Sequence, residues 1–102
     1  MGKAKPLTVG TEVFAKQGDA LLFCKSMLSK YRPDDWVSES DALFLSALLE
    51  RHPNVNEKIG NGVHHFEVMR ADFNTKCFAV VRRDGSRVDF SYLVCIRSAS
   101  KR

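Results

Sequence analysis

The sequence predicts an α+β domain in which two helices pack on one face of a small antiparallel sheet of three to four strands. Two segments in the first half of the chain repeat apolar residues at helical spacing, and three segments in the second half alternate apolar and polar residues as strands do. Both helical segments are too short to be stable alone. Each therefore needs an apolar surface to pack on, which one face of the sheet provides.

The first element is a weak alternation from Leu7 to Phe14, which predicts a short strand added to the sheet. A helix follows from Ala20, with Asp19 as its N-cap. It ends before Pro33, because the residue that precedes a proline avoids the α region. The apolar residues of this helix are Leu21, Cys24, Met27, Leu28 and Tyr31.

A second helix begins at residues 38–41, where Ser38 and Asp41 approximate a capping box, and it ends at His52-Pro53. Its apolar stripe is formed by Phe44, Leu45, Leu48 and Leu49. Trp36 lies between the two helices, and we expect it to be buried at the edge of the core. An exposed tryptophan there would instead indicate a docking site.

The second half of the chain predicts a glycine loop and three strands. Residues 54–63 read as a shaped loop rather than a helix, with Gly60 and Gly62 supplying backbone angles that other residues avoid. The strand candidates cover residues 63–70, 76–82 and 86–95, joined by residues 71–75 and by the Asp84-Gly85 turn.

The alternation of side chains between the two faces of a strand predicts the length of the loop between the last two strands. A two-residue loop would put apolar residues opposite polar ones. A three-residue loop, residues 83–85 with Gly85 left-handed at a β-bulge, pairs apolar residues with each other. The face that covers the helices then carries Phe78, Val80, Val88, Phe90 and Tyr92.

Length and charge predict one domain, residues 7–96, between flexible basic tails at residues 1–6 and 97–102. The formal net charge of +4 comes from the tails, because residues 6–96 hold 11 basic and 12 acidic residues. No apolar run is long enough for a membrane span, and the start of the chain lacks the apolar core of a signal peptide. We therefore expect a soluble cytoplasmic protein without membrane contact.

The cysteine and histidine patterns predict neither a metal site nor a cofactor. Cys24, Cys77 and Cys95 lack zinc-ligand spacing and are expected to be reduced and buried. His64 and His65 are adjacent on a strand, so we expect their rings to point to opposite faces of the sheet.

Two further residues are expected to hold loops. His52 is expected to hydrogen-bond the segment that follows it. Asp89, paired with Lys58 or an arginine, is expected to hold the glycine loop in place.

Basic side chains surround the Asp84-Gly85 turn, and three interpretations stay open. They contact nucleic-acid phosphates, they keep a hairpin tip soluble, or Arg87 forms a salt bridge on the sheet. The candidate nucleic-acid contacts are Lys58, Lys76, Arg82, Arg83 and Arg87.

The second half of the chain also carries a series of short motifs. They are His52-Pro53, Lys58 to Gly62, Lys76-Cys77-Phe78, Val81 to Gly85, Asp89 to Tyr92 and Cys95-Ile96. In this order they resemble the DCL-like (defective chloroplasts and leaves) domain family over residues 52–96, and the chain looks like its small stand-alone bacterial members. Residues 69–76 depart from the family, because they lack a His-Pro pair between the first two strands.

The resemblance implies RNA biology. Plant relatives are tied to plastid ribosomal RNA maturation, and a similar domain ends the largest subunits of plant-specific RNA polymerases. No catalytic residues come with the family. The structural motif positions that it marks here are His52, Pro53, Gly60, Gly62, Asp84, Gly85, Asp89 and Tyr92.

The sequence therefore favours a non-enzymatic RNA-associated binding module, linked to ribosomal RNA maturation, with RNA or ribosomal particles as partners. The second hypothesis is a protein-interaction module that docks to a larger nucleic-acid machine. A hydrolase or nuclease ranks third, because the ordinary catalytic signatures are absent. The open face of the sheet shows no aromatic platform in the sequence, which disfavours base stacking.

Overall fold

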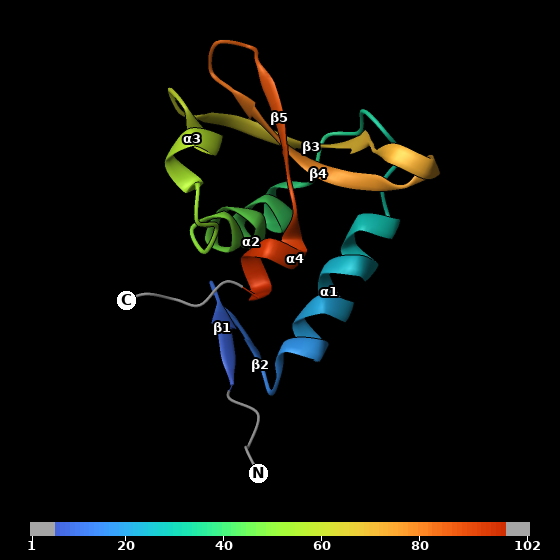
Figure 1. Ribbon diagram of the computed structural model, residues 1–102, viewed down its shortest axis with the longest axis vertical. Coiled ribbons are helices and arrows are strands. Elements are labelled where there is room, and N and C mark those ends of the chain that lie inside the picture. The colour runs from blue at the N-terminus through green and yellow to red at the C-terminus, as the bar shows by residue number, and fades with distance from the viewer. Residues whose placement is uncertain (1–5, 98–102) are drawn as a thin grey trace.

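In the computed structural model, which describes residues 6–97, a three-stranded antiparallel sheet lies at one end and helices lie beneath one of its faces (Figure 1). The predicted α+β class is therefore confirmed. The sheet runs in the order β3-β4-β5, with β3 at Val63–Arg70, β4 at Lys76–Arg82 and β5 at Arg87–Phe90. No helix within residues 6–97 has the length and apolar content needed to cross a bilayer.

The N-terminal segment forms a hairpin of its own, so the single strand predicted from Leu7 to Phe14 is wrong. β1 (Leu7–Val9) pairs with β2 (Glu12–Phe14) at the end of the molecule opposite the main sheet (Figure 1). The chain reverses at Gly10, whose φ is +62°. A left-handed glycine is what a tight hairpin turn requires, and the weak alternation of the sequence hid this turn.

The two predicted helices are present with shifted boundaries. α1 (Gln17–Ser29) begins after Lys16, so Asp19 lies in the first turn and is not the N-cap. α2 (Glu39–Leu49) begins as predicted, with the Ser38 hydroxyl accepting a hydrogen bond of 3.3 Å from the Asp41 backbone N–H. Both helices end several residues before the prolines that were expected to stop them.

The hairpin register is confirmed. Val80 pairs with Val88 and Phe78 with Phe90, across a loop of residues 83–85. Gly85 has a φ of +91°, and its backbone N–H donates to the Arg82 carbonyl as a β-bulge turn requires.

The chain after β5 is helical, so the strand predicted for residues 86–95 is wrong beyond Phe90. α4 (Tyr92–Arg97) follows at once, and the Ser91 hydroxyl accepts a hydrogen bond from the Val94 N–H. Cys95 and Ile96 are consecutive and both fully buried, which a helix allows and an alternating strand does not. Tyr92 therefore begins a helix, and Arg97 ends it instead of starting a tail. The rest of the predicted tails, residues 1–5 and 98–102, lies outside the described residues.

A short helix, α3 (Val55–Ile59), replaces the first part of the loop predicted for residues 54–63. The two glycines behind it do have positive φ angles, +58° at Gly60 and +125° at Gly62. The expectation for their backbone is thus confirmed, and the interpretation of the preceding residues as a loop is wrong.

A fourth strand-like segment lies on the outer edge of β3, and it comes from the connection between α1 and α2. Trp36 bridges Glu67 in antiparallel fashion, and the backbone N–H of Val37 donates to the Phe66 carbonyl at 2.9 Å. Val37 turns into the core, whereas 61% of the Trp36 surface is exposed. The expected burial of Trp36 is therefore wrong, because the edge pairing sends its side chain to the face opposite the helices.

Candidate interaction surface on the open face of the sheet

The Arg82 guanidinium is bound by the protein itself. Its Nε donates to the Lys58 carbonyl at 3.1 Å and its Nη2 to the Glu57 carbonyl at 2.8 Å, while Nη1 donates to the Ser86 hydroxyl at 3.1 Å. These carbonyls belong to α3, whose C-terminal turn has no further helix to satisfy them. Arg82 therefore fixes α3 to the hairpin.

The glycines after α3 make room for the neighbouring arginines. A Cβ at Gly60 would lie 2.7 Å from both Cδ and Nε of Arg82, and one at Gly62 would lie 2.8 Å from Nε of Arg83. Gly60 is therefore required twice, by its φ angle and by the Arg82 side chain that hydrogen bonds hold across it, whereas Gly62 is required by its φ angle, since the exposed Arg83 side chain can move aside.

The two lysine candidates also have internal partners. Lys58 Nζ donates to the Asp89 carbonyl at 2.8 Å, so α3 covers the outer edge of β5. Asp89 therefore contacts Lys58, in the helix before the two glycines, through its backbone carbonyl and not through its carboxylate. Lys76 Nζ donates to the Tyr31 carbonyl at 2.5 Å and holds the end of α1 against the start of β4.

Arg87 spans the sheet. Its Nη1 lies 3.0 Å from Glu67 Oε1 on β3 and 3.1 Å from Asp34 Oδ1 on the outer segment. Because β4 lies between β3 and β5, the Arg87 side chain crosses β4, and Ala79 on that strand is fully buried. The salt-bridge interpretation of Arg87 matches this geometry.

Arg83 differs from the other four candidates. Its backbone N–H donates to the Gly62 carbonyl at 3.0 Å, but its exposed guanidinium has no partner within residues 6–97. Four of the five candidate cations therefore bind groups of the chain.

An aromatic cluster lies on the open face of the sheet, the face turned away from the helices, so the expectation that this face lacks an aromatic platform is wrong. The indole of Trp36 stacks on the His65 ring with centroids 3.6 Å apart and an interplanar angle of 15°. The His64 ring lies edge-on to the indole at 6.1 Å. His65 Nε2 and Glu67 Oε2 are 2.6 Å apart, which joins the cluster to the Arg87 salt bridge.

The two histidine rings lie together, so the expectation that they point to opposite faces is wrong. Their Nδ1 atoms are 2.8 Å apart, and one donates a hydrogen bond to the other. The cause is a register shift between Val63 and His65, since a β-bulge breaks the alternation of side chains. Even so, no group of three or more metal-ligating side chains is found in the described part of the chain.

The open face carries more negative than positive charge. The row that crosses the strands contains Trp36, Glu67, Ala79 and Asp89. With Asp34, three carboxylates belong to this face, and Arg87 pairs with two of them, Glu67 and Asp34. Burial raises the pKa of the Cys77 thiol; the nearby Asp89 carboxylate raises it further, and the Arg87 guanidinium partly opposes this.

The remaining motif residues have local structural roles. His52 is buried, and its Nδ1 accepts a hydrogen bond of 2.9 Å from the Asn54 N–H, as predicted. Asp84 Oδ1 accepts hydrogen bonds from the Ser86 hydroxyl and N–H, which lower the pKa of that carboxyl. These contacts form the turn at the hairpin tip.

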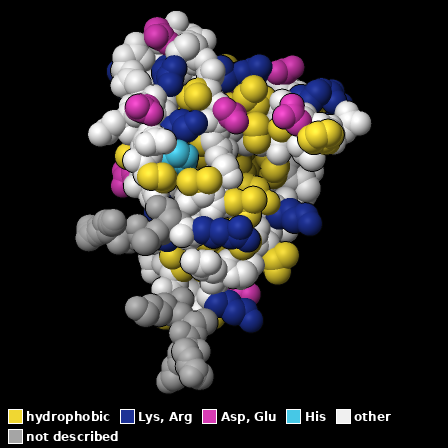
Figure 2. Space-filling view, viewed as in Figure 1, with side chains coloured by type: hydrophobic (Ala, Val, Ile, Leu, Met, Phe, Trp, Pro, Cys, Tyr) yellow, Lys and Arg dark blue, Asp and Glu magenta, His cyan; other side chains and the backbone are white. Residues whose placement is uncertain are grey.

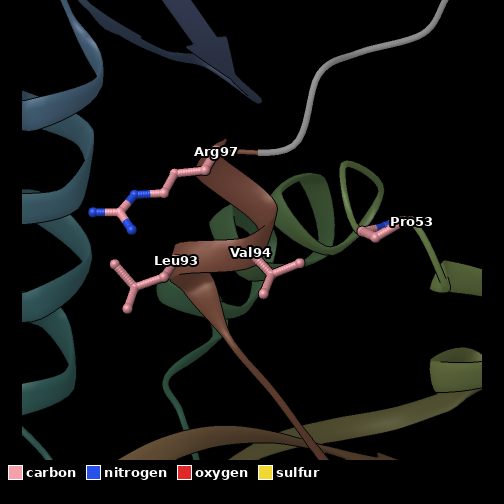
Figure 3. Close-up of a pocket in the computed structure, with 4 residues that line it drawn as sticks. All are labelled: Pro53, Leu93, Val94 and Arg97. Carbon is pink, nitrogen blue, oxygen red and sulfur yellow. The ribbon is translucent and has the colours of Figure 1, made fainter.

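A shallow apolar depression of about 330 Å³ lies on α4, lined by Pro53, Leu93, Val94 and Arg97 (Figure 3). Figure 2 shows hydrophobic side chains along the middle of this side of the molecule, with Lys and Arg side chains around them. Because a strand was predicted through residue 95, this surface of a helix was not expected. Its apolar lining indicates contact rather than catalysis.

Sequence reasoning missed the aromatic cluster because Trp36 and His65 are 29 positions apart. The signal that was available is the polar composition around Trp36, with two aspartates before it and three of the next four residues polar. Charged and polar residues are mostly exposed, and tryptophan is rarely fully buried, so this segment is typical of the surface.

Comparison with known proteins agrees with the motifs. Residues 25–96 match the family described as protein of unknown function DUF3223. The chain is 42% identical over 71 residues to the chloroplastic protein DCL of Solanum lycopersicum, covering 67% of this chain and 32% of that protein. It is 35% identical over 103 residues to DNA-directed RNA polymerase IV subunit 1 of Arabidopsis thaliana, covering 98% of this chain and 7% of the subunit.

A solved structure supports the same fold. The solution NMR structure of an uncharacterized protein from Rhodospirillum rubrum is 49% identical, with a TM-score of 0.85 over 93% of this chain and 91% of that one. The chain thus spans about a third or less of the curated relatives and nearly all of this bacterial structure. From these matches, the protein belongs to the DUF3223 family and is a homologue of the DCL proteins.

Proposed function

We propose that the protein is a non-enzymatic RNA-associated binding module, and that a protein partner in RNA-related machinery docks on the open face of its sheet. The observation that carries the proposal is Trp36, which is 61% exposed and stacked on His65. Exposed tryptophans of this kind are typical anchors of protein interfaces. Relatives within an RNA polymerase subunit and in chloroplast DCL proteins support the RNA-related setting.

Direct RNA contact is the second candidate function. Arg83 favours it, since its guanidinium has no partner among the residues that the structure describes, together with Lys3, Lys5, Lys101 and Arg102 in the sequence. The carboxylates of the open face count against phosphate binding at the sheet itself, because like charges repel in a low-dielectric interface.

The test is affinity capture from a lysate of the source cells, with and without nuclease treatment. Trp36→Ala should lose a protein that the wild type retains after nuclease treatment. Leu43→Ala is the matched control, since it removes another exposed apolar side chain, from α2. Capture that disappears with nuclease, and that depends on Arg83 but not on Trp36, would favour direct RNA contact instead.

A further inference from the structure

We infer that the open face of the sheet receives an arginine side chain of the partner protein, stacked on Trp36 and paired with the carboxylates beside it. This inference rests on the proposed function and specifies the chemistry of the partner.

The indole presents a surface that suits a cation. His65 stacks on it, and His64 meets it edge-on, so these rings fix its orientation. Because 61% of Trp36 remains exposed, the ring keeps a large accessible surface. Tryptophan is the strongest aromatic acceptor of a cation, and a planar guanidinium stacks on it better than an ammonium does.

A carboxylate lies on the same face as the indole. Asp34 is two residues before Trp36, and its contact with Arg87 places its carboxylate on the open face. Arg87 uses Oδ1 of Asp34, and Oδ2 has no partner within residues 6–97. The Asp34 side chain is 78% exposed, so this oxygen is accessible to an incoming guanidinium.

The net negative charge of the open face favours a positively charged ligand. Asp34, Glu67 and Asp89 carry three negative charges, and Arg87 neutralises one of them. Lys58 contacts the outer edge of β5 through the Asp89 backbone carbonyl and not through a carboxylate of this face. A phosphate would meet repulsion here, whereas a cationic side chain gains both ring contact and charge pairing.

The sequence provides a reporter at the site, because Trp36 is the only tryptophan in the chain. The probe is a seven-residue peptide with three arginines separated by Gly-Ser pairs. It is compared with the same peptide containing citrulline in place of arginine, which keeps the shape and removes the charge. Titration of the tryptophan fluorescence at low ionic strength should saturate with the arginine peptide. The citrulline peptide should bind at least fivefold more weakly.

Two variants distinguish the contribution of the Asp34 carboxylate to binding from the effect of the net charge of the protein. Asp34→Asn should weaken arginine-peptide binding at least threefold. Glu12→Gln removes the same charge at the opposite end of the molecule and should leave binding within a factor of about 1.5. Equal binding of the citrulline peptide, or equal weakening by the two variants, would overturn the inference.

A third probe, single-stranded decauridine, tests the alternative ligand. Tighter binding of decauridine than of the arginine peptide at Trp36 would assign the face to RNA and overturn the inference. If Trp36→Ala abolishes capture of a protein partner but the arginine peptide does not bind, the docking function stands and the arginine inference fails. If capture is also independent of Trp36, both fail.

Discussion

The side chain of Arg82 crosses Gly60 so closely that a Cβ at position 60 would lie 2.7 Å from two of its atoms. This contact carries the Arg82 guanidinium to the C-terminal carbonyls of α3. In this chain, Lys58-Ile59-Gly60 and Val81-Arg82 are therefore in direct contact, although 22 positions separate Gly60 from Arg82.

Gly60→Ala should lower the free energy of unfolding by about 2 kcal/mol or more, because it combines a disfavoured backbone conformation with a steric clash. Equilibrium denaturation in urea measures the effect. In a double-mutant cycle, part of the cost should disappear in the Arg82→Ala background, where no side chain crosses the glycine. Strict additivity would show that the crossing does not matter.

Two other glycines are controls for this substitution. Gly85→Ala should cost about 1 kcal/mol, since its φ is positive but a Cβ there meets no atom within 4 Å. Gly18→Ala lies in α1 with no strained φ and no contact, so it should be neutral or stabilising by about 0.5 kcal/mol.

Adjacent arginines should differ in their effect on stability. Arg82→Ala should cost about 1–2 kcal/mol, because it leaves carbonyls of α3 without donors. Arg83→Ala should stay within about 0.5 kcal/mol, as its guanidinium has no partner in the described residues. Thermal unfolding of the two variants gives the comparison, and equal losses would contradict it.

The hairpin between β4 and β5 could be predicted from sequence to the residue, because parity and turn chemistry act locally and agree. The helices α1 and α2 could also be predicted, because the helical spacing of their apolar residues is a local feature of the sequence. The candidate site could not be predicted, because it depends on contacts between distant segments. Trp36 reaches the open face only by pairing with β3, and the two histidine rings meet only through a bulge.

The error at α4 has a different cause. The run from residue 86 to 95 is rich in β-formers, and Tyr-Leu-Val-Cys-Ile fits a strand as well as a buried helix by composition. Tertiary packing decides between them, since Cys95 and Ile96 both fill the core beside Cys24.

Phe73 is strained and unsupported, so its replacement should stabilise the protein. It has a φ of +60° in the turn between β3 and β4, and 96% of its surface is exposed. Phe73→Gly should raise the free energy of unfolding by about 0.5–1 kcal/mol, since glycine tolerates this φ and no burial is lost. Loss of stability in urea denaturation would mean that the aromatic ring has a folded-state contact.

The three thiols should divide into two classes. Burial raises the pKa of Cys24 and Cys95 to about 12, whereas Cys77 is half-buried. At pH 8 a thiol reagent should modify Cys77 first and reach the other two only as the protein unfolds, since the thiolate is the reactive form. Titration in denaturant should count three free thiols. A count of one would reveal a disulfide.

His52 should make stability depend on pH in the mildly acidic range. Burial, and secondarily the charge of Lys58, lower the pKa of His52 in the folded protein. Its Nδ1 accepts a hydrogen bond from Asn54, which requires that this nitrogen carry no proton. The unfolded chain binds the His52 proton more readily than the folded protein does. The stabilisation by neutral His52 is therefore fully present above the unfolded pKa of about 6.5, and it is lost as pH falls through the lower pKa of the folded protein.

The measurement is the free energy of unfolding between pH 8 and pH 5, in the wild type and in His52→Gln. The wild type should lose stability below about pH 6.5, and the variant should show a smaller slope, because glutamine does not titrate. His64→Gln is the matched control, as it removes a histidine from the exposed end of β3. If His64→Gln flattens the profile and His52→Gln does not, the acid sensitivity arises in the aromatic cluster on the open face.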